Sequence, residues 1–129
     1  METTLQKYHP YALSLLRIIA ALVLFSFGTQ KILGFPAADH VPAAYSLSWF
    51  AGLIELVLGF ALLIGFYSRI AAFVLSGEMA FAYFIAHFPK GVYPAQNGGV
   101  AAILFCFTFL YLAISGPGPV SVDGARRGP

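Results

Sequence analysis

Charged side chains are scarce in this sequence of 129 residues: Lys, Arg, Asp and Glu make up 9% of it, against about 25% in an ordinary soluble domain. Apolar residues make up 60%, and the mean hydropathy is +0.83. A soluble chain of this length has to cover its surface with polar groups, and this chain has too few of them. The composition therefore excludes most soluble proteins and predicts an integral membrane protein whose outer surface contacts lipid.

Motifs for metal, thiol and nucleotide chemistry are also missing. The one cysteine, Cys106, has no partner for an internal disulfide, and the sequence contains no CxxC, HExxH, GxGxxG or Walker motif. The three histidines, His9, His40 and His87, do not fit a metal-ligand spacing, so we expect neither a metal nor a haem. A net charge of +2 without a Lys/Arg block argues against a nucleic-acid partner.

Four apolar stretches are long enough to cross a bilayer as helices, which takes roughly 20 residues at ~1.5 Å per residue. They cover residues 11–33, 47–66, 69–87 and 98–115. The alternating pattern of a transmembrane β-barrel is absent. We predict an all-α, polytopic membrane protein, a single domain over residues 1–129 built as a four-transmembrane-helix bundle. Residues 116–129 are predicted to form an extended tail, because Pro117 and Pro119 cannot continue a helix.

The connections and the basic residues predict how the chain lies in the membrane. Residues 65–68 leave room only for a tight turn, so the second and third helices form an antiparallel hairpin. Five basic residues fall on one side of the membrane and two on the other; they are Lys7, Arg17, Arg69, Arg126 and Arg127, against Lys31 and Lys90. The positive-inside rule then places both termini and the tail in the cytoplasm.

A weak internal repeat divides the chain in two. Arg17 and the apolar run after it resemble Arg69 and its run at an offset of 52 residues, and Pro42 matches Pro94 at the same offset. The offset predicts two helical hairpins that run parallel to each other.

Charged residues within the predicted spans are the best candidates for a functional site. Glu55 and Glu78 lie near mid-bilayer, and the side chain of Arg17 is able to reach the same layer. An isolated charge there costs at least ~2.5–3.5 kcal/mol, so such residues usually face the interior and pair. We predict a catalytic site in which Glu55 and Glu78 converge with Arg17 as counter-ion, one carboxyl holding a proton. The alternatives are an Arg–Glu ion pair that only fixes the helix register, or two protonated acids hydrogen-bonded to nearby backbone.

A second polar layer is predicted near the outer boundary. Lys31 ends the first span and His87 ends the third, while Tyr83 lies one helical turn before His87 and Asn97 begins the fourth span. Together these four residues are candidate ligands for an anionic or quinone headgroup. The alternative is structural: Lys31 extends to the interface and His87 caps a helix end.

Short segments in order along nearly the whole chain resemble the DoxX family of small four-helix membrane proteins. They are Leu16-Arg17-Ile18, Gly28-Thr29-Gln30-Lys31, Ala51-Gly52-Leu53-Ile54-Glu55, Ser68-Arg69-Ile70-Ala71-Ala72, Glu78-Met79-Ala80, Ala82-Tyr83-Phe84, His87-Phe88-Pro89, Asn97-Gly98-Gly99, Gly116-Pro117-Gly118-Pro119 and Ser121-Val122-Asp123. The resemblance implies a multi-pass protein of a bacterial or archaeal inner membrane. Some relatives are similar to subunits of thiosulfate:quinone oxidoreductase, and others associate with membrane redox complexes. Where the family often has Glu after Asn-Gly-Gly, this chain has Val100, which weakens any outer-layer chemistry that uses that acid.

Three functions follow from these observations. The favoured hypothesis is a membrane subunit linked to redox chemistry, acting on quinone with electrons supplied by a partner or a bound donor. Its partners would be lipid and other membrane redox proteins, or further copies of the chain. The alternatives are a non-catalytic scaffold for membrane assembly and a small transporter or proton conductor.

Overall fold

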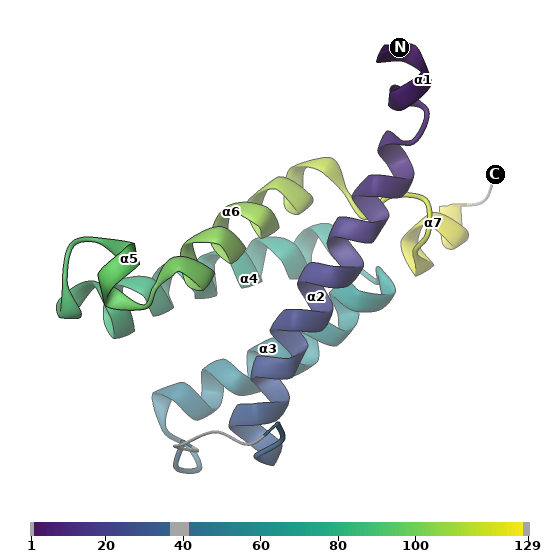
Figure 1. Cartoon of the computed structure of the whole chain (residues 1–129). Coiled ribbons are helices and arrows are strands. Elements are labelled where there is room, and N and C mark those ends of the chain that lie inside the picture. The colour runs from purple at the N-terminus through teal and green to yellow at the C-terminus, as the bar shows by residue number, and fades with distance from the viewer. Residues whose placement is uncertain (1, 37–41, 128–129) are drawn as a thin grey trace.

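The computed structural model describes residues 2–36 and 42–127, and these form helices joined by turns and irregular segments (Figure 1). The elements are α1 (Glu2–Gln6), α2 (His9–Leu33), α3 (Leu47–Ile64), α4 (Ser68–Ala82), η1 (Tyr83–His87), η2 (Phe88–Lys90), α5 (Pro94–Asn97), α6 (Val100–Ser115) and α7 (Val122–Arg127). Helices α2, α3 and the continuous helical segment Ser68–Lys90 are long and apolar enough to cross a membrane, and α6 is a shorter apolar helix of 16 residues. The prediction of an all-α, multi-pass membrane protein is confirmed.

The long helices form two hairpins, α2 with α3 and α4 with α6 (Figure 1). Both hairpins begin at the end of the molecule where α7 lies, which we call the tail end, and they diverge from it. Most packing is within each hairpin; between hairpins, α3 contacts α4, whereas α2 and α6 meet only slightly. The four helices are therefore two splayed pairs, and their common direction agrees with the parallel repeat predicted from the sequence.

Small residues bring α2 and α3 close together. A Cβ atom added to Gly28 would lie 2.7 Å from the backbone nitrogen of Leu56, and one added to Gly59 would lie 3.5 Å from the Cα atom of Phe25. Small residues commonly allow close helix packing in membranes. Burial of apolar side chains does not by itself drive helices together there, because lipid is equally apolar. The core joins both hairpins near the tail end; its buried members are Ala20, Ala21, Leu24, Leu62, Ala71, Ala72, Leu75, Met79, Phe109 and Leu112.

The predicted turn between the second and third spans is confirmed. Helix α3 ends at Ile64, Gly65 adopts a left-handed conformation with φ of 77°, and α4 begins at Ser68. At the other end of α3, the Ser46 side chain accepts a hydrogen bond from the backbone N–H of Trp49 and caps the helix. The segment between the first two predicted spans, residues 34–46, falls partly outside the described residues, which omit 37–41 and so Asp39 and His40.

The tail differs from the extended segment that was predicted for residues 116–129. Residues 116–121 fold back across α2 and the α3–α4 turn, and residues 122–127 form α7. The two oxygens of Asp123 accept hydrogen bonds from the backbone N–H groups of Tyr67 and Ser68 at 2.9 and 2.8 Å. The tail thus caps α4 with a side chain from 55 residues further along the chain.

Candidate functional site

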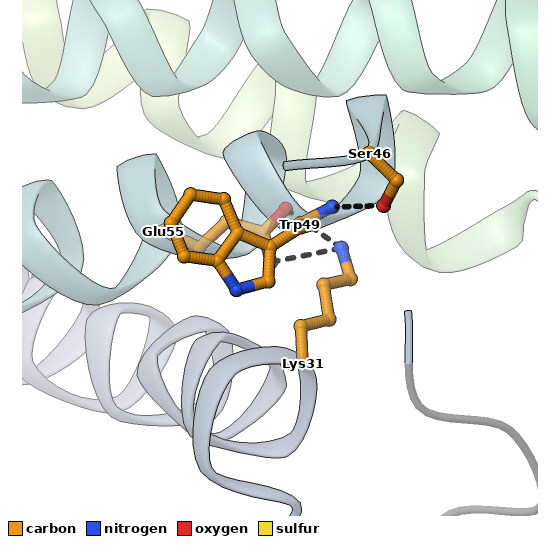
Figure 2. Close-up of polar contacts among 4 residues, drawn as sticks. All are labelled: Lys31, Ser46, Trp49 and Glu55. Atoms are coloured by element: carbon orange, nitrogen blue, oxygen red, sulfur yellow. Dashed lines mark hydrogen bonds and ion pairs between the residues drawn. The ribbon is translucent and has the colours of Figure 1, made fainter. Parts of the chain in front are cut away.

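A buried ion pair joins α2 to α3. The Nζ atom of Lys31 lies 3.0 Å from both carboxylate oxygens of Glu55 (Figure 2). The Glu55 side chain is 1% exposed and that of Lys31 is 27% exposed, so the carboxylate is taken out of contact with lipid and solvent. A buried charge needs a partner of this kind, because its desolvation is otherwise uncompensated.

Gly52 makes room for this pair. It lies one turn before Glu55 on the same face of α3, and a Cβ atom there would come within 2.6 Å of the Lys31 Cβ atom. The Lys31 stem runs over the glycine, and its ammonium group reaches the carboxylate in the next turn. Gly52, Glu55 and Gly59 are all buried, so this face of α3 is directed to the interior.

Glu78 of α4 extends the pair into a cluster of three ionisable residues. Its carboxyl group interacts by charge with Glu55 and with Lys31. Its Oε1 atom is buried without a hydrogen-bond partner among the described residues. The predicted convergence of Glu55 and Glu78 is therefore present, and it links the two hairpins.

Two cavities border the cluster in the space between the hairpins, which we call the cleft. The larger, of about 430 Å³, is lined by Lys31 and Glu78 and by apolar side chains of α3, α4 and η1 that include Phe50, Ile54, Phe81 and Ile85. The smaller, of about 120 Å³, is lined by Lys31, Glu55 and His87 together with α6 residues that include Phe105. Lys31 and His87 line both cavities.

His87 is held by the loop that precedes α6. Its Nδ1 atom lies 3.2 Å from the backbone oxygen of Asn97. The Asn97 side chain donates to the Tyr83 hydroxyl at 3.0 Å and to the Gly91 oxygen at 2.9 Å, and it accepts from the Gly99 N–H at 2.8 Å. Tyr83 and Asn97, predicted as ligand residues, therefore form a network that holds the loop and positions His87.

The predicted role of Arg17 as counter-ion of the carboxylates is wrong. Its guanidinium donates to the backbone oxygens of Pro117, Val120 and Leu63, which belong to the tail and to the end of α3. The side chain is 1% exposed and also interacts by charge with Asp123. Arg17 therefore fastens the tail, and Lys31 takes the position that was expected for it.

A further hollow lies at the tail end, between the α3–α4 turn and α7. It has a volume of about 450 Å³ and is lined by residues that include Arg69, Arg126 and Asp123. The Asp123 carboxylate is already bound to the α4 backbone, and Arg69 donates to the α6 oxygens of Ala113 and Ile114. Because these polar groups are engaged within the protein, the cleft is the better candidate site.

The polar groups of the cleft are of kinds that bind and move protons. Lys31 has three N–H donors, two of which are directed to Glu55, and Glu78 adds a carboxyl group that can gain or lose a proton. His87 adds a second titratable group. Among the described residues, no three His, Cys, Asp or Glu side chains are grouped as a metal site.

Comparison with known proteins identifies a family whose matched region contains the charged residues of the cleft. The family model described as DoxX matches residues 12–88, which include Lys31, Glu55, Glu78 and His87. A protein of Haemophilus influenzae described as uncharacterized is 41% identical over 125 residues, covering 92% of this chain and 93% of the relative. No solved structure matches the chain significantly.

Proposed function

The chain belongs to the DoxX family of multi-pass membrane proteins, and we propose that it is a membrane subunit of a redox system that binds a quinone headgroup in the cleft. The observation that carries the proposal is the meeting of a buried, charged cluster with an apolar cavity of about 430 Å³. A quinone has the same two-part character, with polar ring oxygens and an apolar ring and tail.

The residues of the cleft fit such a ligand. Phe50, Ile54 and Phe81 offer apolar surface for a ring and for the start of an isoprenoid chain. Lys31 offers a donor at one side of the cavity, and Glu78 adds a carboxyl group to its lining. Together these groups satisfy both the apolar and the polar parts of the ligand.

In this proposal the chain contributes binding and proton transfer. Quinone chemistry exchanges two electrons and two protons, and the electrons come from a partner protein or a small donor. Lys31 holds Glu55 as a carboxylate through two charge-assisted hydrogen bonds. Glu78 and His87 are the groups that take up or release a proton at the cavity wall.

We propose the same membrane placement that the sequence predicts. The protein lies in a bacterial or archaeal inner membrane with both termini in the cytoplasm, so that the α3–α4 turn and α7 face the cytoplasm and the Asn97 loop faces outward. The larger cavity then lies between helices that cross the bilayer, where a lipid-soluble ligand is concentrated.

The single tryptophan allows a direct binding test. Trp49 lies in the first turn of α3, between Ser48 and Phe50, and both of these neighbours line the larger cavity. Quinones quench tryptophan fluorescence, so a short-chain ubiquinone analogue added to the protein in nanodiscs should quench Trp49 saturably. We expect Lys31→Gln to weaken this binding about tenfold, as for the loss of one charged hydrogen bond.

The control for that test is Lys90→Gln, which removes the same charge from an exposed residue outside the two cavities. It should bind as the unchanged protein does. Linear, non-saturating quenching that is identical in the unchanged protein and in Lys31→Gln would refute the quinone site. A proton flux in proteoliposomes that depends on Glu55 and Glu78 would then favour the alternative function, a small proton conductor.

A further inference from the structure

The hollow at the tail end adjoins an apolar groove on the outside of the α4–α6 hairpin. The hollow has a volume of about 450 Å³, and its lining includes Arg69, Ile70 and Arg126. The groove, which we call the α4–α6 groove, has a volume of about 550 Å³ and is lined by Arg69, Ile70, Phe73, Leu110, Ala113 and Ile114. Because Arg69 and Ile70 line both, a polar hollow and an apolar groove meet at the start of α4.

Arg126 brings a guanidinium group to the α7 side of the hollow. Its Cζ atom lies 5.6 Å from the ring centre of Phe66 and 5.7 Å from that of Tyr67. Contacts with two aromatic rings hold the guanidinium in place without using its N–H donors. The side chain is exposed and forms no hydrogen bond or ion pair with the rest of the described chain, so these donors remain open to a ligand.

Arg69 brings a second guanidinium group from the first turn of α4. Its Nη1 atom donates to the backbone oxygens of Ala113 and Ile114, which holds the group against the end of α6. The Nε and Nη2 atoms form no hydrogen bond within residues 2–36 and 42–127, and the side chain is exposed. Arg69 therefore keeps N–H donors for an acceptor from outside the protein.

The acidic residue of the hollow is bound to the protein. The oxygens of Asp123 accept from the backbone N–H groups of Tyr67 and Ser68, and its charge also interacts with the buried Arg17. Two arginines and one aspartate line the hollow, so its charged side chains carry a net positive charge. Guanidinium groups in such a place bind phosphate oxygens well, because both their charge and their N–H geometry suit them.

From this arrangement we infer that the hollow and the α4–α6 groove together bind one anionic phospholipid. Its phosphate contacts Arg69 and Arg126, and an acyl chain follows Ile70 and Phe73 along the groove. A phospholipid has the same order of parts, an anionic headgroup followed by apolar chains. Arg69 lies where a membrane-crossing helix begins, which is the depth of the headgroups, and basic pockets between helix ends are typical sites for anionic lipids. The inference does not depend on the ligand of the cleft.

Quenching by brominated lipid shows which lipid occupies the groove. Phe73→Trp places a fluorophore in the groove, and Trp49→Phe removes the natural tryptophan from α3. The full-length double variant is reconstituted into vesicles of phosphatidylcholine and phosphatidylglycerol, with bromine on the acyl chains of each lipid in turn. We expect phosphatidylglycerol to bind beside the introduced tryptophan about tenfold more strongly than phosphatidylcholine.

Arg126→Gln in the same background tests the headgroup contact. One arginine near the membrane surface is worth roughly a fivefold difference in lipid affinity, so the preference should fall to about twofold. The variant leaves the hydrogen bonds of the tail in place. Lys7→Gln is the matched control, since it removes the same charge from an exposed residue that precedes α2 on the predicted cytoplasmic side and lines neither the hollow nor the groove. It should keep the preference.

Inorganic phosphate distinguishes a lipid headgroup from a free anion. Sodium phosphate, compared with sodium chloride at the same ionic strength, should leave the quenching by brominated phosphatidylglycerol unchanged. If phosphate displaces the brominated lipid, the hollow is a site for the free anion and the assignment of a lipid is wrong. Equal quenching by the two lipids, or an equal loss of preference in Lys7→Gln and Arg126→Gln, overturns the site itself.

Discussion

At the scale of single residues, the most informative side chain is Lys31. Lysines near the end of a transmembrane helix usually extend toward the interface, where the ammonium keeps its hydration. Here the side chain turns inward across Gly52 and meets the buried Glu55 carboxylate. That direction places a positive charge beside an apolar cavity, which is a costly arrangement for a purely structural pair.

Breaking this pair from the lysine side should destabilise the protein. Lys31→Met keeps the length of the stem and leaves Glu55 buried without its counter-ion. We expect a loss of about 3 kcal/mol, the lower end for a buried pair, because Lys31 is itself 27% exposed. Thermal unfolding in detergent, followed by the reaction of the half-buried Cys106 thiol with a maleimide dye, measures the change.

The double variant Lys31→Met/Glu55→Met is the control for that measurement. It removes both charges and fills the space with apolar atoms, so most of the lost stability should return. If the double variant is as unstable as the single one, the cost lies in helix packing and the charge is not its cause.

Gly52 offers a sharper test of the same geometry. Gly52→Ala adds a Cβ atom 2.6 Å from the Lys31 Cβ atom, and it should displace the lysine, lower stability and weaken quinone binding. Gly77→Ala is the matched control, since a Cβ atom there meets nothing within 4 Å. Equal melting temperatures and equal affinities of the two variants would contradict the described path of the Lys31 side chain.

Depth along the predicted spans indicated part of this site. The similar depth of Glu55 and Glu78 correctly brought them together. The prediction of Arg17 as the counter-ion was wrong, because it compared only the positions of Arg17 and Lys31 along the helix axis. It took no account of the direction in which each side chain points. The inward turn of Lys31 depends on Gly52 of the neighbouring helix, and no pattern within α2 reveals it.

At the scale of elements, the tail acts as a folded part of the membrane domain. The hydroxyl of Ser14 donates to the Pro117 oxygen and accepts from the Val120 N–H, while Arg17 donates to three backbone oxygens. Gly118 packs against α2 so closely that a Cβ atom would lie 2.2 Å from the Ser14 hydroxyl oxygen. These contacts hold the ends of α2, α3 and α4 together.

Asp123 should therefore matter for helix α4 as well as for the tail. Asp123→Ala removes both acceptors from the backbone N–H groups of Tyr67 and Ser68, and we expect a loss of about 1 kcal/mol with release of α7. Limited proteolysis should cut this variant after Arg126 much faster than the unchanged protein. Asp123→Asn keeps one acceptor and should lie between the two; equal cleavage of all three proteins would refute the cap.

The prediction of an extended tail was wrong because it used only local sequence signals. The two prolines correctly exclude a helix over residues 117–119, but whether a non-helical segment is extended or docked depends on distant partners. Those partners are Ser14 and Arg17, about 100 residues earlier in the chain. Hydropathy and turn residues are local signals, and they sufficed for the four apolar helices and the α3–α4 turn.

At the scale of the whole molecule, the two hairpins share the tail end and diverge from it (Figure 1). The two cavities of the cleft are lined by residues of both hairpins. The charged side chains of the helices are divided between the tail end and the cleft. Arg17 and Arg69 bind backbone oxygens at the tail end, whereas Lys31, Glu55 and Glu78 meet between the hairpins. The charges at the tail end thus hold the structure together, and those in the cleft form the proposed site.

The orientation in the membrane is tested with single cysteines in a Cys106→Ser background. Ala125→Cys lies in α7 and Val92→Cys lies in the loop before α5, and both positions are exposed. We expect a membrane-impermeant maleimide to label Val92→Cys from the outer side and Ala125→Cys only after the inner membrane is opened. Labelling of both from the same side would contradict an arrangement in which one crossing, α6, separates Val92 from Ala125.

The central claim is that a quinone headgroup binds between the two hairpins, and photolabelling tests it most directly. A short-chain azidoquinone is cross-linked to the protein in nanodiscs, and the labelled residues are located by mass spectrometry. The account predicts labelling concentrated at Phe50, Ile54, Phe81 and Ile85, competed by unlabelled quinone and reduced in Lys31→Gln but not in Lys90→Gln. Labelling spread evenly over the lipid-facing sides of α2 and α6, and unaffected by competitor, would contradict it.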